Sequence, residues 1–296
     1  LAGDEEAGRL FYLALMPSLF GPTVRALDGL GMLTCEPGTK RGWRRVVVEK
    51  PFGKDLGQAV ALNAELREVL REDQILRIDH YLGKETVQNI LAFRFQNAIF
   101  EPLWNREHIE SVEISVCEQV TMEGGRGGYY DGSGAIRDML QNHVLQVLAL
   151  IAMDAPNAMD ADEVRGQKVR VLQALTPFSR ERVRRDVVRG QYVAAEGKPG
   201  YLEEDGVPAD SQTESFVAIR ANIQHWRWNG APFLLRTGKA MNKRYTDVTL
   251  RFRTPPVDLL GNTEFDAAVC ALRPNALRLS IQPTEGIHLG FLVKRP

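Results

Sequence analysis

Residues 74–95 read QILRIDHYLGKETVQNILAFRF, and they mark the place where a strand gives way to a helix. Residues 74–78 are mostly apolar and have the length of a buried strand, whereas apolar side chains recur at helical spacing over residues 84–95. The turn between them holds a carboxylate, an imidazole, a phenol and an amine, which belong to Asp79, His80, Tyr81 and Lys84. Such a crowded turn is a candidate binding site.

A strand end that meets a helix start is where α/β proteins commonly place ligands. The free N–H groups of the helix start, together with Lys84, can face an anion such as a phosphate. The same residues also suit an ordinary strand-to-helix turn, with His80 and Tyr81 packed and the charges solvated. The residues alone leave both interpretations open.

The preceding sequence predicts two more strands of the same kind. Residues 9–15 and 45–49 are apolar runs typical of strands buried on both faces of a parallel sheet, and residues 20–33 between them have helical character. Asp55 and Gln58 then form a capping-box-like start for a helix that leads to the strand before Asp79. We therefore expect three strand ends to meet at one crevice of a doubly wound, Rossmann-like α/β sheet.

The pattern changes after residue 95. Residues 111–118 alternate apolar and polar side chains, as a half-covered antiparallel strand does. Similar runs occur at residues 187–193, 215–222, 233–237, 248–253 and 277–282. The second part is therefore predicted to be a larger α+β domain with a mostly antiparallel sheet, and the domain boundary is expected between residues 95 and 109.

Residues 135–150 predict a helix that is apolar over most of its circumference in its second half. His143 lies in it, with Met139 and Val147 one turn to either side. A histidine on such a face is often a satisfied core residue. It can also serve as a general base if a carboxylate such as Asp79 reaches one ring nitrogen and fixes the tautomer.

Other polar residues have both a structural and a functional interpretation. Lys50 follows a predicted strand and can face a cofactor amide or a sugar hydroxyl, or simply be solvated. Residues 124–128 read GGRGG but do not lead directly into a helix, so we interpret them as a flexible turn rather than a phosphate cradle. Lys239 and Arg244 can add charge to an anion site or belong to the surface.

The composition excludes several classes of protein. The chain has 296 residues, 44% of them hydrophobic and 25% charged, with a formal net charge of −1, which is typical of a globular protein and gives no basic excess for nucleic acid or membrane surfaces. Its three cysteines lack both a disulfide framework and a zinc spacing, which favours a reducing cytoplasm. The longest apolar run, residues 144–153, is too short to span a bilayer.

Seven blocks, in the same order along the chain, resemble the glucose-6-phosphate dehydrogenase family. They are residues 10–15, 48–53, 77–85, 125–129, 136–138 with 141–143, 190–192, and 236 with 238–240. The resemblance implies that residues 1–100 are the C-terminal part of an NADP-binding Rossmann domain. It also implies that residues 101–296 are an incomplete α+β domain for substrate binding and dimerisation.

The resemblance also implies a role for each matching residue. His143 matches the general base that takes the proton of the sugar C1 hydroxyl while hydride leaves C1 for the nicotinamide, and Asp79 matches the carboxylate that orients this base. The matches to phosphate ligands are His80, Tyr81 and Lys84. The matches to further substrate-binding residues are Glu118, Asp138, Lys239 and Arg244. Lys50 matches the cofactor-side lysine near the reacting hydroxyl, and no metal is expected.

The chain departs from the family pattern in its dinucleotide fingerprint. No strand, glycine-rich turn and helix precede residue 10, so the preference for NADP over NAD is inherited from the resemblance alone. Leu1 is not an initiating methionine, and we expect the chain to be a fragment. The expected partner is glucose 6-phosphate, with no nucleic acid or membrane partner, in a cytoplasmic homodimer or homotetramer.

Two alternatives stay open. One is another nicotinamide-dependent sugar oxidoreductase, since the Glu49-Lys50-Pro51 turn and a later helical Asp and His also resemble the group that contains glucose–fructose oxidoreductase. The phosphate cluster argues against it, because an unphosphorylated sugar has no use for such a cluster. The other alternative is a non-catalytic remnant that binds sugar phosphate or serves as a scaffold.

Overall fold

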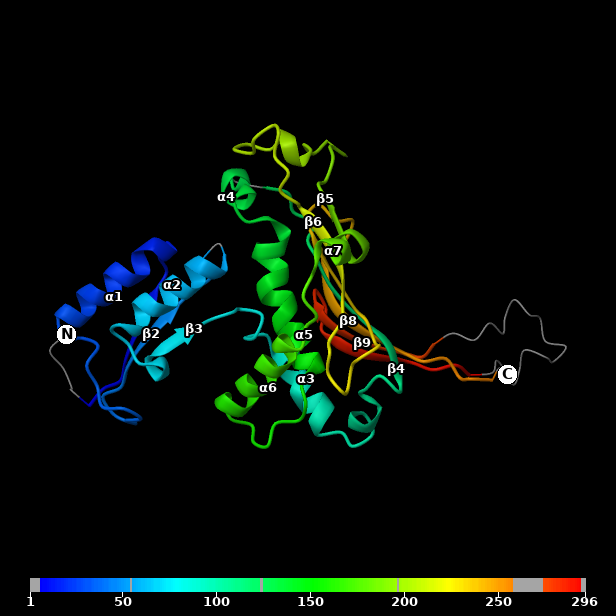
Figure 1. The fold of residues 1–296 in the computed structure, drawn as a ribbon, viewed down its shortest axis with the longest axis horizontal. Coiled ribbons are helices and arrows are strands. Elements are labelled where there is room, and N and C mark those ends of the chain that lie inside the picture. The colour runs from blue at the N-terminus through cyan, green and yellow to red at the C-terminus, as the bar shows by residue number, and fades with distance from the viewer. Residues whose placement is uncertain (1–5, 54, 123–124, 196, 258–273, 294–296) are drawn as a thin grey trace. The chain divides into compact units, whose positions relative to one another are not determined.

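The computed structural model describes residues 6–53, 55–122, 125–195, 197–257 and 274–293. By the contacts within the chain it divides into two compact units, Leu1–His80 and Tyr81–Pro296 (Figure 1). We call them the N-terminal unit and the C-terminal unit, and each is described by itself.

The N-terminal unit is a small parallel α/β sheet. Its elements are β1 (Arg9–Leu13), η1 (Pro17–Leu19), α1 (Phe20–Gly29), β2 (Arg44–Val48), α2 (Leu56–Arg67), η2 (Glu72–Gln74) and β3 (Ile75–Arg77). The strands lie in the order β1-β2-β3, and both pairs are parallel. The predicted parallel sheet with helical crossovers is therefore confirmed.

The expected burial of these strands on both faces is wrong for β1. Leu10 and Tyr12 are each 53% exposed, whereas Phe11 and Leu13 pack into the core of the unit. The reason is that α1 and α2 contribute their apolar side chains to one face only of the described sheet. The predicted cap is confirmed, because the Asp55 carboxylate accepts a hydrogen bond from the Gln58 N–H at 2.9 Å.

The C-terminal unit is a layer of helices on a large sheet. Its helices are α3 (Glu85–Phe95), η3 (Glu101–Leu103), α4 (Gly127–Asp131), the π-helical η4 (Ile136–Val144), α5 (Leu145–Ala152), α6 (Ala161–Gln173), α7 (Arg180–Asp186) and η5 (Tyr201–Glu203). Its strands are β4 (Ile109–Cys117), β5 (Val187–Gly190), β6 (Phe216–Ala221), β7 (Phe233–Gly238), β8 (Tyr245–Phe252), β9 (Ala276–Gln282) and β10 (Gly286–Gly290).

The strands of this unit form one sheet in the order β10-β9-β8-β4-β7-β6-β5 across the described residues. Every pair is antiparallel except β4 and β7, which run parallel. The predicted mostly antiparallel α+β sheet is confirmed, but β4 is not the half-covered antiparallel strand that its alternation suggested. It lies in the middle of the sheet, where most of its residues are buried.

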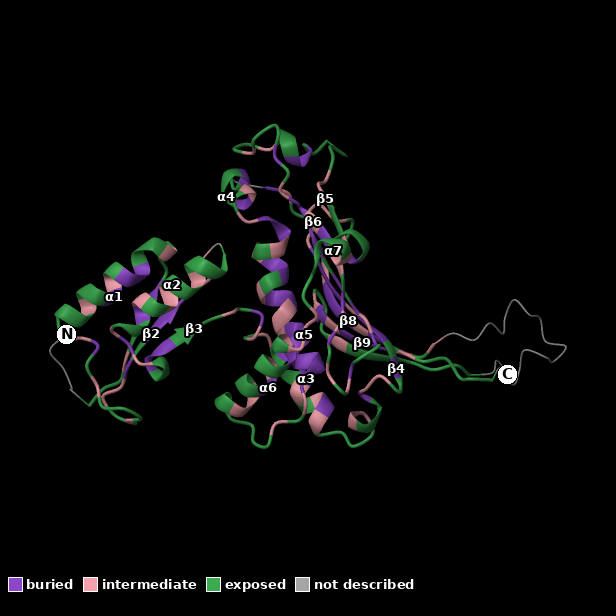
Figure 2. Ribbon diagram, viewed as in Figure 1, coloured by how far each residue is buried: buried purple, intermediate pink, exposed green. Residues whose placement is uncertain are grey.

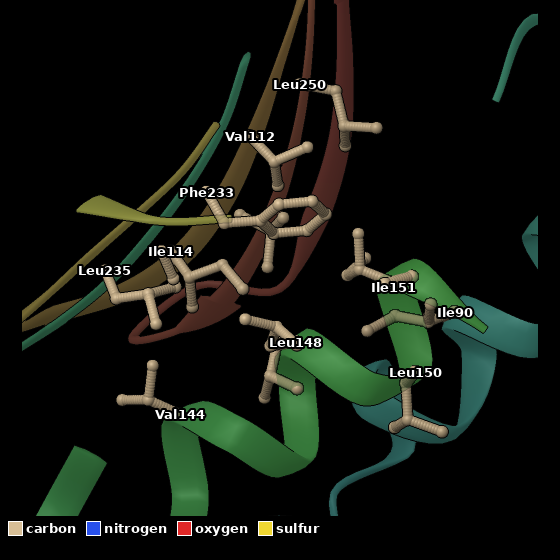
Figure 3. Close-up of a cluster of buried hydrophobic side chains, with 14 of the residues drawn as sticks. Ile90, Val112, Ile114, Val144, Leu148, Leu150, Ile151, Phe233, Leu235 and Leu250 are labelled. Atoms are coloured by element: carbon tan, nitrogen blue, oxygen red, sulfur yellow. The ribbon is translucent and has the colours of Figure 1, made fainter. Parts of the chain in front are cut away.

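The core lies between this sheet and the continuous helix formed by η4 and α5. Val144, Leu148 and Ile151 point from the helix toward the sheet (Figure 3). The facing side chains are Val112 and Ile114 of β4, Phe233 and Leu235 of β7, and Leu250 of β8. The purple interior and green outer surfaces of Figure 2 show the same layering. Among the described residues, no helix is both long and apolar enough to cross a bilayer.

Buried polar side chains close the C-terminal end of α5. The fully buried Arg94 guanidinium donates to the carbonyls of Leu150 and Met153, both at 2.8 Å. The indoles of Trp104 and Trp228 donate to the carbonyls of Ile151 and Ala152. Burial lowers the pKa of Arg94 to about 10, which is still above neutral pH, so the charge is retained. These donors satisfy carbonyls that have no partner within the helix.

Helix α3 belongs to the C-terminal unit. The unit boundary falls after His80 rather than near residue 100, because Val87 and Ile90 of α3 are buried in the core of the larger sheet. The assignment of residues 1–100 to cofactor binding and 101–296 to substrate binding and dimerisation stays a prediction.

The prediction that the glycine-rich segment does not lead directly into a helix is wrong, because Gly127 and Gly128 begin α4, whereas Gly125 and Arg126 form a turn just before it. Gly127 is buried at the start of α4, and a Cβ on it would lie 2.2 Å from the carbonyl oxygen of Asp205. Gly128 similarly faces Gly206, where a Cβ would meet the carbonyl oxygen at 3.2 Å. These glycines allow two backbone segments to approach closely.

We therefore expect Gly127→Ala to destabilise the protein by about 1–3 kcal/mol, the usual cost of overpacking. Gly166 provides the matched control. It is exposed within α6 with no atom within 4 Å of a built Cβ, so Gly166→Ala should stabilise by about 0.5–1 kcal/mol. Denaturant unfolding measures the change in stability of each variant relative to the unaltered chain. An unfolding midpoint of Gly127→Ala equal to that of Gly166→Ala would contradict the close approach at Gly127.

Candidate active site

The parallel pairing of β4 with β7 brings two predicted site residues together. Parallel strands end at the same edge, and Cys117 of β4 is paired with Gly238 of β7. Glu118 and Lys239 follow directly, and the Lys239 ammonium lies 2.9 Å from the Glu118 carboxylate. This side chain of Lys239 is only 14% exposed. The Glu118 side chain is 32% exposed, so the pair is buried mainly on the lysine side.

A second group of predicted residues forms a stack. The rings of Tyr81 and His143 lie 4.4 Å apart with an interplanar angle of 18°, and the Lys84 ammonium lies 4.3 Å from the centre of the Tyr81 ring. Tyr81 and His143 are 4% and 1% exposed. The stack fixes the plane of the imidazole, because burial and the phenol ring leave it little freedom to rotate.

The environment of Lys84 marks a place for an anion. Burial lowers the pKa of Lys84, the nearby positive charge of Arg244 lowers it further, and Glu285 acts in the opposite direction. Two cations held near each other repel, and a bound anion removes that cost. Lys84 is also the N-cap residue of α3, so the N–H groups at the start of this helix lie beside it.

Asp138 lies near the ring of Tyr130. Burial raises the pKa of Tyr130 strongly, and the negative charges of Asp138, Glu214 and Glu118 raise it further. The Lys239 ammonium lies 5.4 Å from the centre of the same ring. Tyr130 therefore stays a neutral phenol between acidic groups and one cation.

The remaining predicted residues belong to the N-terminal unit. Val48 of β2 is paired with Arg77 of β3, and the Ile78 N–H continues the ladder to the Val48 carbonyl at 3.2 Å. Lys50 lies two residues after Val48, and Asp79 lies two residues after Arg77, so both are at the carboxyl edge of the sheet. His80 follows Asp79 and is exposed. Sequence reasoning placed all three at strand ends, and this placement is confirmed.

Two further residues at the site were not singled out from the sequence. The Thr246 hydroxyl of β8 lies 3.4 Å from the Tyr81 hydroxyl, and Tyr130 lies against Lys239. A threonine in an alternating strand gives no sequence signal, because any strand contains such residues. Tyr130 belongs to a tyrosine pair directly after the glycine-rich segment, which could have indicated a packed site. Interpreting that segment as a flexible turn gave no reason to expect the pair to be buried.

The arrangement can bind an anion and move a proton. The C-terminal unit supplies a buried imidazole of fixed orientation, a cationic site at Lys84 and Arg244, and further charged groups at Glu118, Asp138 and Lys239. The parallel sheet of the N-terminal unit, with Lys50 at its carboxyl edge, fits a dinucleotide. The segments joining β1 to α1 and β2 to α2 contain one glycine, Gly53, so neither supplies a glycine-rich pyrophosphate turn.

A parallel α/β unit followed by an α+β unit places the chain in the class of dinucleotide-binding α/β proteins that carry a second, α+β unit. Residues 2–89 match the family description "Glucose-6-phosphate dehydrogenase, NAD binding domain", and residues 91–296 match "Glucose-6-phosphate dehydrogenase, C-terminal domain". The chain therefore belongs to the glucose-6-phosphate dehydrogenase family.

Individual relatives agree with this assignment. The chain is 46% identical to a glucose-6-phosphate 1-dehydrogenase of Aggregatibacter actinomycetemcomitans over 295 residues, and 45% identical to that of Bacillus subtilis (strain 168) over 291 residues. These matches cover 98% and 97% of the chain but 57% of each relative, so the chain spans less than two thirds of their length.

Solved structures give the same result. One is described as glucose-6-phosphate dehydrogenase in complex with its substrate glucose-6-phosphate, and it matches with a TM-score of 0.86 and 40% identity over 99% of this chain and 57% of its own. A glucose-6-phosphate 1-dehydrogenase from Mycobacterium avium matches with a TM-score of 0.82 and 40% identity, over 97% and 59%.

The charges around Lys84 generate a prediction for its reactivity. Arg244→Gln removes a positive neighbour, which should raise the pKa of Lys84, leave less free amine at pH 9 and slow acetylation. Glu285→Gln removes a negative neighbour and should have the opposite effect. Mass spectrometry of the acetylated protein measures both rates, with the exposed Lys198 as internal control. A faster reaction at Lys84 in Arg244→Gln would contradict this electrostatic account.

Proposed function

We propose that the chain acts as a glucose-6-phosphate dehydrogenase, as an NADP-dependent enzyme acting on a CH–OH group. The reaction oxidises the C1 hydroxyl of D-glucose 6-phosphate to 6-phospho-D-glucono-1,5-lactone, the first step of the oxidative pentose phosphate pathway. The observation that carries the proposal is the stack of His143, Tyr81 and Lys84, which joins a buried imidazole to a cationic anion site.

His143 is the general base of this proposal. Its ring accepts the proton of the C1 hydroxyl as the C–H bond breaks, because one ring nitrogen of a neutral imidazole is a proton acceptor. Stacking on Tyr81 supports the role, since a base must be held within hydrogen-bond reach of its proton. Asp79 accepts a hydrogen bond from the other ring nitrogen in this proposal and fixes the tautomer.

His80, Tyr81 and Lys84 bind the substrate phosphate, with Arg244 as a further basic group. An imidazole, a phenol and an ammonium are all donors, and charge-assisted hydrogen bonds to a dianion are among the strong ones. The repulsion between Lys84 and Arg244 supports the assignment, because the phosphate would relieve it.

In this proposal the sugar hydroxyls are bound by Glu118, Asp138 and Lys239. The carboxylates accept hydrogen bonds from hydroxyl groups, and the ammonium donates to hydroxyl oxygens. The ion pair of Glu118 with Lys239 supports this role, since each partner orients the other.

NADP is the proposed cofactor, and it supplies the nicotinamide ring that accepts the hydride from C1. Lys50 binds on the cofactor side, near the reacting hydroxyl. The parallel sheet and the match to an NAD-binding domain description support dinucleotide binding. The preference for NADP over NAD comes from the family resemblance.

The same proposal includes the roles of the two domains, the oligomeric state and the cellular location of the protein. Residues 1–100 serve the cofactor, residues 101–296 serve the substrate and dimerisation, and the assembly is a cytoplasmic homodimer or homotetramer without nucleic-acid or membrane partners. Light scattering of the purified protein measures the oligomeric state.

A non-catalytic sugar-phosphate-binding protein is the second candidate. The observation that favours it is that the cationic site at Lys84 and Arg244 lies within the C-terminal unit, where an anion can bind without a cofactor. Turnover separates the two candidates. The chain is incubated with glucose 6-phosphate and NADP, and reduced cofactor is followed by absorbance while calorimetry measures sugar-phosphate binding. Turnover supports the dehydrogenase, whereas binding without turnover supports the second candidate.

His143→Asn should lower turnover by about 10²–10⁴-fold with little change in the affinity for glucose 6-phosphate, because a general base acts mainly in the transition state. Steady-state kinetics and binding calorimetry measure the two effects. His288→Asn is the control, since His288 is an exposed histidine of the same unit. Equal losses of turnover and affinity would count against His143 as the base.

His80→Asn should raise KM for glucose 6-phosphate several-fold while kcat changes little, because the lost donor binds the phosphate in ground state and transition state alike. The matched control is His108→Asn, at an exposed histidine. An unchanged KM would remove His80 from the phosphate site.

A further inference from the structure

Lys239 is held by an aromatic ring as well as by a carboxylate. Its ammonium lies 5.4 Å from the centre of the Tyr130 ring and 2.9 Å from the Glu118 carboxylate. A cation within about 6 Å of a ring centre is attracted by the negative face of the ring, more strongly when water is excluded. The ring is 4% exposed and the lysine side chain 14%, so solvent competes weakly for this cation.

Tyr130 itself is fixed by a small core that is separate from the main one. Its members are Met122, Tyr130 and Tyr201, with Tyr192 and Val207 packed against them. The rings of Tyr130 and Tyr201 meet edge to face at 6.2 Å, and those of Tyr192 and Tyr201 at 5.7 Å. Edge-to-face aromatic pairs have a preferred geometry, so the plane of the Tyr130 ring is defined by its neighbours.

Hydrogen bonds lock the same core. The Tyr201 hydroxyl donates to the Asp131 carboxylate at 2.9 Å, and the Ser211 hydroxyl donates to the same oxygen. The Tyr192 hydroxyl donates to Glu204 at 2.7 Å, and Glu204 also accepts from the Met122 N–H. The bonds at Asp131 and Met122 tie these two residues to Tyr201, Ser211 and Glu204, and Gly127 permits a close approach to Asp205.

We propose that Tyr130 is a positioning residue for the sugar-binding end of the site, and that it acts by holding the Lys239 ammonium on the face of its ring. The tyrosine core gives that ring a fixed place, and Glu118 holds the ammonium from another side. The ligand so recognised is the hydroxyl-bearing part of the sugar phosphate, whereas Lys84 and Arg244 recognise the phosphate. The inference rests on the proposed function, because it concerns the same site.

The cation–π contact can be tested without any ligand. Aromatic ring current should shift the side-chain NMR signals of Lys239 upfield in the unaltered chain, and Lys239→Arg assigns them by their loss. The shift should persist in Tyr130→Phe, which keeps the ring, and vanish in Tyr130→Leu. Tyr192→Leu removes a ring from the same core without touching Lys239 and is the control. Unshifted Lys239 signals in the unaltered chain would overturn the proposal even if Tyr130→Leu does not fold.

Binding then tests the positioning role. Calorimetry with glucose 6-phosphate and with inorganic phosphate should show that Tyr130→Leu weakens only the sugar phosphate, by about twofold to thirtyfold, the range expected for a cation–π contact. Tyr130→Phe should restore the affinity. Equal weakening of both ligands, or no difference between the Leu and Phe variants, would overturn the proposal. If the unaltered chain binds no glucose 6-phosphate, the proposed function fails together with the positioning role, whereas the NMR result still reports the contact.

Discussion

The burial of one apolar helix against the large sheet is the constraint on which the site depends. The helix formed by η4 and α5 carries Val144, Leu148 and Ile151, and these side chains are buried against an apolar face of the sheet (Figure 3). His143 precedes the first of these core residues, so the packing that buries Val144 also fixes the position of the imidazole. A side chain on a packed helix is held more precisely than one on a loop. The buried donors around the end of α5 secure the other end.

A second constraint is the parallel pair inside an otherwise antiparallel sheet. Because β4 and β7 run in the same direction, the residues that follow them meet at one edge. Glu118 and Lys239 are far apart in the sequence, yet they become an ion pair there. Strand β8 starts at the same edge, since Tyr245 is paired with Cys117, and this brings Arg244 near the start of α3. The pairing of three strands thus gathers the charged groups of the C-terminal unit.

How far the sequence predicts this protein depends on the range of the interactions involved. The helix cap at Asp55 and the helix from Glu85 were predictable, because both follow from neighbouring residues. The central place of β4 was not, because alternation along one strand does not show which strands lie beside it. The role of Gly127 was missed for the same reason, since the backbone it faces at Asp205 is distant in the sequence.

By itself, the sequence determined the classes of the two sheets, the strand ends that carry Lys50 and Asp79, and the family, because periodicity and ordered motifs are written along the chain. Only the tertiary structure decided that Tyr81 stacks on His143, that Arg244 lies near Lys84 and that Tyr130 faces Lys239. Those contacts depend on strand order and on the direction of each side chain, which local patterns do not specify. Packing determines these contacts, because each buried side chain must fill the space left by neighbours that are distant in the sequence.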